Sequence, residues 1–168
     1  MNTLSTPEVT TTLEPTPVVE LVPHTDVVHL DKVWNEIEPM LMEYEEVWGF
    51  LYTIDWIKNT IMSGAIQVWI LRDALDSPVK LVYLTQIMKY PQRDVLEVFF
   101  TCGEGLFKHQ DLLEVVEQCA VRSGVEISKI GGRRGFERLL KRRGYRMENV
   151  TFTKWLICLL YTSDAADE

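Results

Sequence analysis

The sequence is poor in cysteine and has neither a long hydrophobic run nor a metal-binding motif. Three cysteines in 168 residues are too few for a disulfide framework, and no CxxC pair or Cys/His cluster indicates zinc. No apolar run approaches the roughly 18 residues that a membrane helix needs, and no basic region followed by an apolar core marks a secretory signal. These absences predict a reduced, cytoplasmic protein that holds no metal and contacts no membrane.

The residues that are present suit one folded domain. Hydrophobic residues make up 46% of the chain and the formal net charge is −8, as in many single soluble domains. Residues 1–23 contain six Thr and four Pro without a hydrophobic period, which predicts a flexible tail. Residues 24–157 form the predicted domain. Residues 158–168 resemble a translated sequencing adapter and are excluded from the fold; the alternative is a genuine polar C-terminus.

Hydrophobic periodicity predicts alternating strands and helices. A short apolar run at 27–30 is typical of a strand, and Asp31 is a candidate N-cap for a helix through about residue 44, interrupted at Pro39. In the helix that Thr53 begins, the residues expected to face inward are Trp56, Ile57, Thr60 and Ile61. The further predicted elements are a helix from Thr53 to Gly64, strands at 65–72, 80–90 and 95–101, a helix at 108–123, a strand at 125–130, a helix after Gly132 to about 143, and a strand at 150–157.

Short turns between these elements predict the sheet topology. Asp76-Ser77-Pro78 and Pro91-Gln92-Arg93-Asp94 are turn sequences, so the three strands that they join are expected to form an antiparallel meander. The strand at 125–130 follows a helix, which favours a parallel crossover.

The element order and one long stretch resemble a known family. The stretch from Gly132 to Tyr145 (GRRGFERLLKRRGY) is the most specific part, and residues 27–41, 53–70 and 90–93 also contribute. From about residue 26 to 157 the chain resembles the GNAT superfamily of N-acetyltransferases, and within it GNAT-like proteins encoded by tailed bacteriophages. The resemblance implies an α+β, three-layer fold with a mixed, mostly antiparallel sheet and helices on both faces.

The resemblance also implies acetyl-CoA as co-substrate and an amine that attacks its thioester directly. It places the pyrophosphate loop after the third strand of the meander, where a glycine turn at a helix N-terminus would cluster N–H donors. The family's usual Gln/Arg-x-x-Gly-x-Gly/Ala signature is reduced here to Gly103-x-Gly105, and the alternative is an ordinary strand-to-helix turn. The implied cofactor-binding residues of this loop are Gly103, Glu104, Gly105, Leu106, Phe107 and Lys108.

The reacting groups are implied by the same resemblance. Backbone N–H groups from about Phe99 to Thr101 would meet the oxyanion, provided that a bulge frees them. Glu97, the charged residue within 95–100, is the candidate general base; the alternative is a solvent-facing strand position. The family's frequent general acid is a Tyr, and its position here is occupied by Leu140.

Positive charge is concentrated in residues 128–147, which hold eight Lys or Arg and one acid. Such segregation predicts an anion-facing patch, and Arg133 and Arg134 are expected to reach the phosphates of CoA. One alternative is a nucleic-acid-binding module that uses helix 133–146, and another is a solvated basic face. A third alternative for the whole chain is a non-catalytic GNAT-fold virion or host-interaction protein. The resemblance is compatible with a homodimer.

Overall fold

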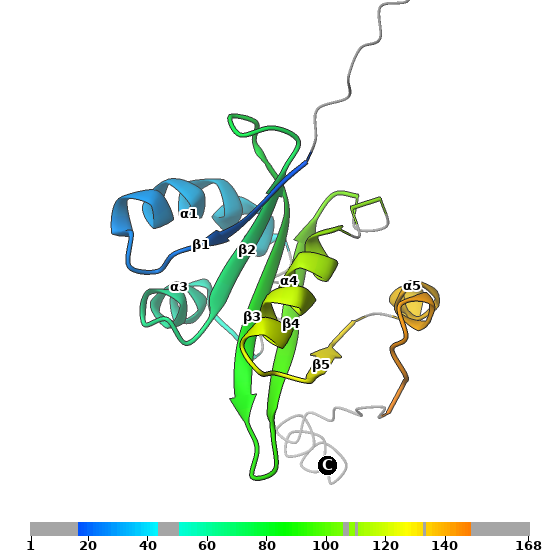
Figure 1. The fold of residues 1–168 in the computed structure, drawn as a ribbon. Helices are drawn as coiled ribbons and strands as arrows, with labels where there is room; N and C mark the ends of the chain where they lie inside the picture. Colours follow the sequence, from blue (N-terminus) through cyan, green and yellow to red (C-terminus); the bar gives the residue numbers. More distant parts are fainter. Residues whose placement is uncertain (1–16, 44–50, 106–107, 110, 133, 149–168) are drawn as a thin grey trace, which may run out of the picture. The chain divides into compact units, whose positions relative to one another are not determined.

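The computed structural model describes residues 17–43, 51–105, 108–109, 111–132 and 134–148 (Figure 1). The chain separates into two units, residues 1–132 and 133–168. The strand predicted at 150–157 and the adapter-like residues 158–168 lie outside the described residues.

A five-stranded sheet organises the first unit. β1 to β4 pair antiparallel in chain order, and β4 and β5 pair parallel. The antiparallel meander and the parallel crossover predicted from the turns are therefore confirmed. The strands are β1 (Val18–Val22), β2 (Gln67–Arg72), β3 (Val79–Lys89), β4 (Asp94–Gly103) and β5 (Ile127–Ile130).

The beginning of the fold differs from the prediction. Residues 27–30, predicted as a strand, begin helix α1 (Val27–Met42), and the edge strand β1 lies within the predicted tail. Asp26 rather than Asp31 caps α1, since its Oδ1 accepts a hydrogen bond from the His29 N–H at 3.0 Å. The apolar residues at 27–30 do not form the buried strand that was predicted. Val27 and Val28 are exposed, and Leu30 alone of this run enters the core.

Helices α1 and α3 (Ile54–Met62) cover one face of the sheet (Figure 1). α3 begins at the predicted N-cap Thr53, whose Oγ1 accepts from the Trp56 N–H at 3.2 Å. α1 runs unbroken through Pro39. A single apolar cluster joins both helices to the strands, and its largest members are Leu30, Trp34, Ile37, Leu41, Ile57, Ile61, Ile66, Ile70, Leu84 and Phe100.

Helix α4 (Asp111–Arg122) packs on the opposite face against β1 and β2. Its buried Leu112, Leu113 and Val116 are not part of the cluster under α1 and α3. Side chains along a strand point to the two faces of the sheet in turn. Because Ile70 of β2 points to the face of α1 and α3, Trp69 and Leu71 point to the face of α4. The predicted arrangement, a mixed and mostly antiparallel sheet with helices on both faces, is confirmed.

The second unit contains a 3-10 turn, η1 (Arg134–Phe136), and helix α5 (Glu137–Arg142). The helix ends as predicted at Gly144, where the Gly144 N–H donates to the Lys141 carbonyl at 3.1 Å and the Tyr145 N–H to the Leu140 carbonyl at 3.0 Å. α5 is shorter than predicted, because its first residues adopt the tighter 3-10 turn.

Two absences hold for the described part of the chain. No helix there combines the length and hydropathy needed to cross a bilayer. No three His, Cys, Asp or Glu side chains among those residues gather into a group that could hold a metal ion.

Candidate functional site

β4 carries a bulge at Phe99. The β3–β4 register places Val98 opposite Thr85 and Phe100 opposite Leu84, so that Phe99 has no counterpart on β3. A bulge leaves one residue outside the ladder and bends the strand. It lies at the start of the segment from Phe99 to Thr101 that was predicted to supply oxyanion donors. Thr101 itself pairs regularly, opposite Tyr83.

The pairing of β4 with β5 stops where the bulge begins. The parallel ladder runs from Val95 opposite Ile127 to Val98 opposite Ile130, and the Gly131 N–H donates to the Val98 carbonyl at 3.3 Å. β4 continues to Gly103, paired with β3 alone. Within the described residues, the other edge of β4 therefore has no strand beside it from Phe99 onward. Such an edge offers backbone donors and acceptors to an extended ligand.

The connection that follows β4 is folded on itself. The Glu104 N–H donates to the Lys80 carbonyl at 2.9 Å, and the N–H groups of Lys108 and His109 both donate to the Gly105 carbonyl, at 2.7 and 2.9 Å. Gly103 has φ +116°, and a Cβ there would lie 2.1 Å from the Lys80 carbonyl oxygen. Glycine at 103 is thus required by its close approach to β3.

Some backbone N–H groups of this loop are therefore already hydrogen-bonded and cannot bind a phosphate. Of the residues predicted to bind the cofactor, Glu104 and Lys108 have their N–H groups engaged inside the chain, whereas Leu106 and Phe107 lie outside the described residues. Gly105 has φ +79° and is exposed. The exposed Lys108 side chain precedes α4, where a cation can meet a bound anion.

Glu97 lies on the sheet face that carries α1 and α3, two residues before the bulge. It sits opposite Gln86, whose Nε2 donates to the Glu97 Oε2 at 2.7 Å. Gln86 shares a face with the core residue Leu84 because the two are two positions apart. Glu97 is half-buried, and its role as general base stays a prediction.

Aromatic side chains from α3 and its approach adjoin the bulge residue. Tyr52 stacks on Trp56, with ring centroids 5.0 Å apart and planes at 29°, and is tilted against Phe99, with centroids 6.0 Å apart. Trp56 is 45% exposed, so its prediction as an inward residue was wrong. Ile57 and Ile61, which were predicted to face inward as well, are buried and form the apolar stripe of α3, with Trp56 at its margin.

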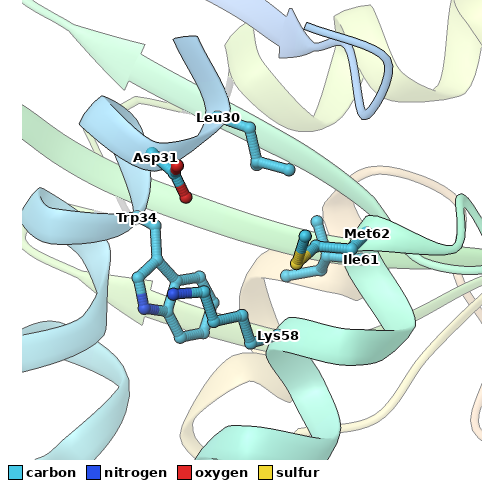
Figure 2. Close-up of a pocket in the computed structure, with 6 residues that line it drawn as sticks. All are labelled: Leu30, Asp31, Trp34, Lys58, Ile61 and Met62. Atoms are coloured by element: carbon cyan, nitrogen blue, oxygen red, sulfur yellow. The ribbon is translucent and has the colours of Figure 1, made fainter. Parts of the chain in front are cut away.

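A separate shallow surface hollow lies between α1 and α3. Figure 2 shows Lys58 extended over the Trp34 indole, with its Nζ 5.4 Å from the ring centroid. The Trp34 Nε1 is buried and makes no hydrogen bond in the described part of the chain. None of the residues predicted for the functional site lines this hollow, which is lined by Leu30, Asp31, Trp34, Lys58, Ile61 and Met62.

The remaining predicted residues belong to the second unit. Arg133 and the side chain of Arg134 lie outside what the structure describes, and their contact with CoA stays a prediction. Leu140, at the position of the family's frequent Tyr, is half-buried in α5.

Comparison with known proteins identifies the fold. No protein-family model matches this sequence, and no curated protein matches it. A ribosomal-protein-alanine N-acetyltransferase from Brucella melitensis biovar Abortus is 12% identical, with TM-score 0.60 over 83% of this chain and 99% of that chain. An aminoglycoside acetyltransferase from an uncultured soil metagenomic sample is 10% identical, with TM-score 0.60 over 84% and 99%. A GNAT family acetyltransferase from Staphylococcus aureus is 12% identical, with TM-score 0.54 over 84% and 99%. At these identities the likeness establishes the fold alone: the chain has the fold of the GNAT acetyltransferases.

Proposed function

We propose that this chain is an acetyl-CoA-dependent N-acetyltransferase. The observation that carries the proposal is the coincidence of two features of β4. The bulge at Phe99 and the end of pairing with β5 at Val98 occur at the same point, on a fold shared with proteins described as acetyltransferases. This coincidence leaves backbone groups beside an open strand edge, and such groups can bind an extended arm and a developing oxyanion together.

In this mechanism the chain contributes position and charge. Bound acetyl-CoA supplies the activated acetyl group. The open edge of β4 from Phe99 to Gly103 binds the extended arm as an added strand. Backbone N–H groups near Phe99 stabilise the oxyanion as the amine nitrogen forms its bond to the carbonyl carbon. The C–S bond then breaks and the sulfur leaves as a thiolate.

Glu97 accepts the proton that the amine loses. The hydrogen bond from Gln86 holds one carboxylate oxygen, and the remaining acceptor sites of the carboxylate are able to take a proton. Leu140 has no proton to donate, so we assign protonation of the thiolate to water.

The cofactor's phosphates are assigned to the loop and to the basic segment. Gly103 to Lys108 would supply the contacts, with Gly105 as the closest backbone approach and Lys108 as a cation, and Arg133 and Arg134 would add charge-assisted hydrogen bonds. Since three N–H groups of the connection are engaged internally, cation side chains carry more of this binding than in a loop of free donors. A tailed-bacteriophage origin and a homodimer rest on the sequence resemblance, and a cytoplasmic location rests on the sequence composition.

A second candidate is a non-catalytic GNAT-fold protein, for example a virion or host-interaction component. The self-closed connection, in which Lys108 and His109 both donate to the Gly105 carbonyl, favours it. In this case the loop would be an ordinary strand-to-helix turn and the edge of β4 would bind no CoA.

Thermal unfolding with acetyl-CoA, desulfo-CoA or ATP separates the two candidates. Ligand at 100 times its Kd stabilises the folded state by about 2.7 kcal/mol. We expect Tm to rise with both CoA compounds and to stay unchanged with ATP. An equal response to ATP would indicate a general anion site, and no response to any of them would favour the non-catalytic protein.

A further inference from the structure

The side of the candidate site next to α3 has a chemistry of its own. We call Tyr52, Trp56 and Phe99 the aromatic wall. Two of its members come from α3 and its approach, and the third is the bulge residue of β4. The contacts between their rings join the first turn of α3 to the point where acetyl transfer is proposed to occur.

The aromatic wall is partly exposed to solvent. Trp56 is 45% exposed, and Tyr52 and Phe99 are half-buried against the core cluster. The stacking of Tyr52 on Trp56 fixes a flat apolar surface before any ligand arrives, and aromatic faces bind other rings and cations. Tyr52 and Phe99 are held by the core, while Trp56 is largely exposed.

A carboxylate lies next to the aromatic wall. Glu97 and Phe99 are two residues apart on the same face, which separates their Cα atoms by about 7 Å. Gln86 donates one hydrogen bond to Glu97. Lys129 of β5 lies opposite Glu97, but its Nζ is directed over the Tyr90 ring, 5.4 Å from the centroid. Among the described residues no Lys, Arg or His forms an ion pair with Glu97. A half-buried carboxylate beside aromatic rings matches a ligand that is positive at one end and flat at the other.

We propose that the acceptor is a primary amine joined by a short linker to an aromatic ring. The ring lies on the aromatic wall with its amine-bearing end toward Phe99, and the ammonium faces Glu97, which takes its proton. A two-carbon linker holds the nitrogen roughly 5 Å from the ring centre, which is comparable to the step from Phe99 to Glu97. This inference rests on the proposed function. It disfavours polyhydroxylated amines, which lack a flat apolar group.

An amine of this kind can be a free arylalkylamine or the N-terminus of a peptide, and the assay includes both. Free arylalkylamines are represented by tryptamine, and peptide N-termini by a Trp-Gly amide. n-Butylamine is the amine without a ring, and sisomicin the polyhydroxylated amine. With acetyl-CoA present, CoA release is expected to show kcat/KM about tenfold higher for one or both aromatic amines than for n-butylamine. Equal values for n-butylamine, or a preference for sisomicin, would overturn the proposal while leaving acetyl transfer established.

Two variants test whether the aromatic wall causes the preference for aromatic amines. Trp56→Ala is expected to lower the ratio of kcat/KM for tryptamine to that for n-butylamine by about fivefold or more. Leu75→Ala removes a 73% exposed apolar side chain in the turn between β2 and β3 and serves as the matched control, with an unchanged ratio. An unchanged ratio in both variants would remove the aromatic wall from the acceptor site.

Calorimetry separates this inference from acetyl transfer itself. Tryptamine and its uncharged analogue tryptophol are titrated into the protein with and without desulfo-CoA. We expect tryptamine to bind about tenfold tighter than tryptophol, and Glu97→Gln to reduce this difference to near unity, because the charge that distinguishes the two ligands loses its partner. Such binding supports the aromatic wall even if no acetyl group is transferred. Absence of tryptamine binding under both conditions would overturn the inference.

Discussion

The Gln86 side-chain amide donates to the Glu97 carboxylate at 2.7 Å across β3 and β4, two residues before the bulge at Phe99. The carboxylate lies on the face of α1 and α3, and within the described residues its other oxygen accepts no hydrogen bond. A carboxylate held in this way, next to an interruption of the backbone ladder, joins a proton acceptor to a place where N–H donors leave the sheet.

The first prediction concerns this carboxylate. Glu97→Gln keeps the shape of the side chain and removes the proton acceptor. We therefore expect the rate of acetyl transfer to fall by roughly 10²–10⁴-fold, with acetyl-CoA binding by calorimetry unchanged. A fall of less than tenfold would assign deprotonation to water or to the free-base form of the amine.

The second prediction concerns the ion pair of Glu36 and Arg72, which ties α1 to β2. Arg72 donates to both Glu36 oxygens at 2.8 and 2.7 Å, and the Val79 N–H donates to the same carboxylate at 3.0 Å. The hydrogen bonds from Arg72, followed by that from Val79, lower the pKa of Glu36 against the opposing effect of burial. Glu36→Gln leaves the guanidinium without its charge partner, and we expect a loss of about 1–2 kcal/mol at pH 7 after allowance for the exposure of Glu36.

The dependence of this loss on pH follows from the lowered pKa. The stability contributed by Glu36 is present above its unfolded pKa and is lost as pH falls through the lower, folded pKa. The wild-type advantage in urea unfolding should therefore be constant near neutrality and shrink below about pH 4.5. Asp31→Asn, at an exposed position of the same helix, is the control. A difference between wild type and Glu36→Gln that persists at pH 2 would contradict the assignment.

Several elements could be read from the sequence because their signals are local. The cap at Thr53, the turn at Asp76-Ser77-Pro78 and the helix end at Gly144 each act within a few residues, and all three lie where they were predicted. β1 was missed because it is an edge strand in a Thr- and Pro-rich context, and Val22 is its one fully buried residue.

The parts of the site that were missed depend on distant residues. The bulge at Phe99 is a change of register against β3, which no pattern within β4 reveals. Tyr52 and Phe99 meet although they are 47 positions apart in the sequence. Helical periodicity predicted Trp56 inward together with Ile57 and Ile61, but only the two isoleucines occupy the core stripe. One signal was available: a Trp immediately beside an Ile pair spaced by four cannot share the centre of the same stripe.

The third prediction compares two glycines with positive φ. Gly103→Ala places a Cβ 2.1 Å from the Lys80 carbonyl oxygen, whereas Gly124→Ala, at φ +81°, meets no atom within 4 Å. The second change is expected to cost about 1 kcal/mol, from the left-handed backbone alone. The first adds a backbone clash and should cost about 3 kcal/mol or more. Equal losses of unfolding free energy in chemical denaturation would mean that β3 and β4 move apart at Gly103 without an energetic penalty.

The fourth prediction concerns Cys102. Burial, with a smaller contribution from Glu43, raises the pKa of its thiol to about 12. At pH 8 this leaves on the order of 10³-fold less thiolate than in an ordinary cysteine. Iodoacetamide followed by peptide mass spectrometry should therefore modify the half-buried Cys119 before Cys102, which reacts after unfolding in urea. Early modification of Cys102 in the native protein would show that the end of β4 opens readily.

The last prediction separates a phosphate role of the basic segment from nucleic-acid binding. Arg138 and Arg142 are exposed on α5, whereas Lys141 is paired with Glu137 at 2.5 Å, which reduces the charge that it presents. If the segment serves CoA, Arg133→Ala and Arg134→Ala weaken CoA binding by about 1–3 kcal/mol each, the scale of a charge-assisted hydrogen bond, and Arg138→Ala and Arg142→Ala leave it unchanged. We expect this pattern.

If the segment binds nucleic acid, all four changes weaken binding of duplex DNA by similar amounts. Each then makes the dependence of log K on log salt shallower by about one unit, because one counterion fewer is released. Titrations of CoA and of duplex DNA at two salt concentrations distinguish these results, and no effect on either ligand would leave α5 as a solvated basic face.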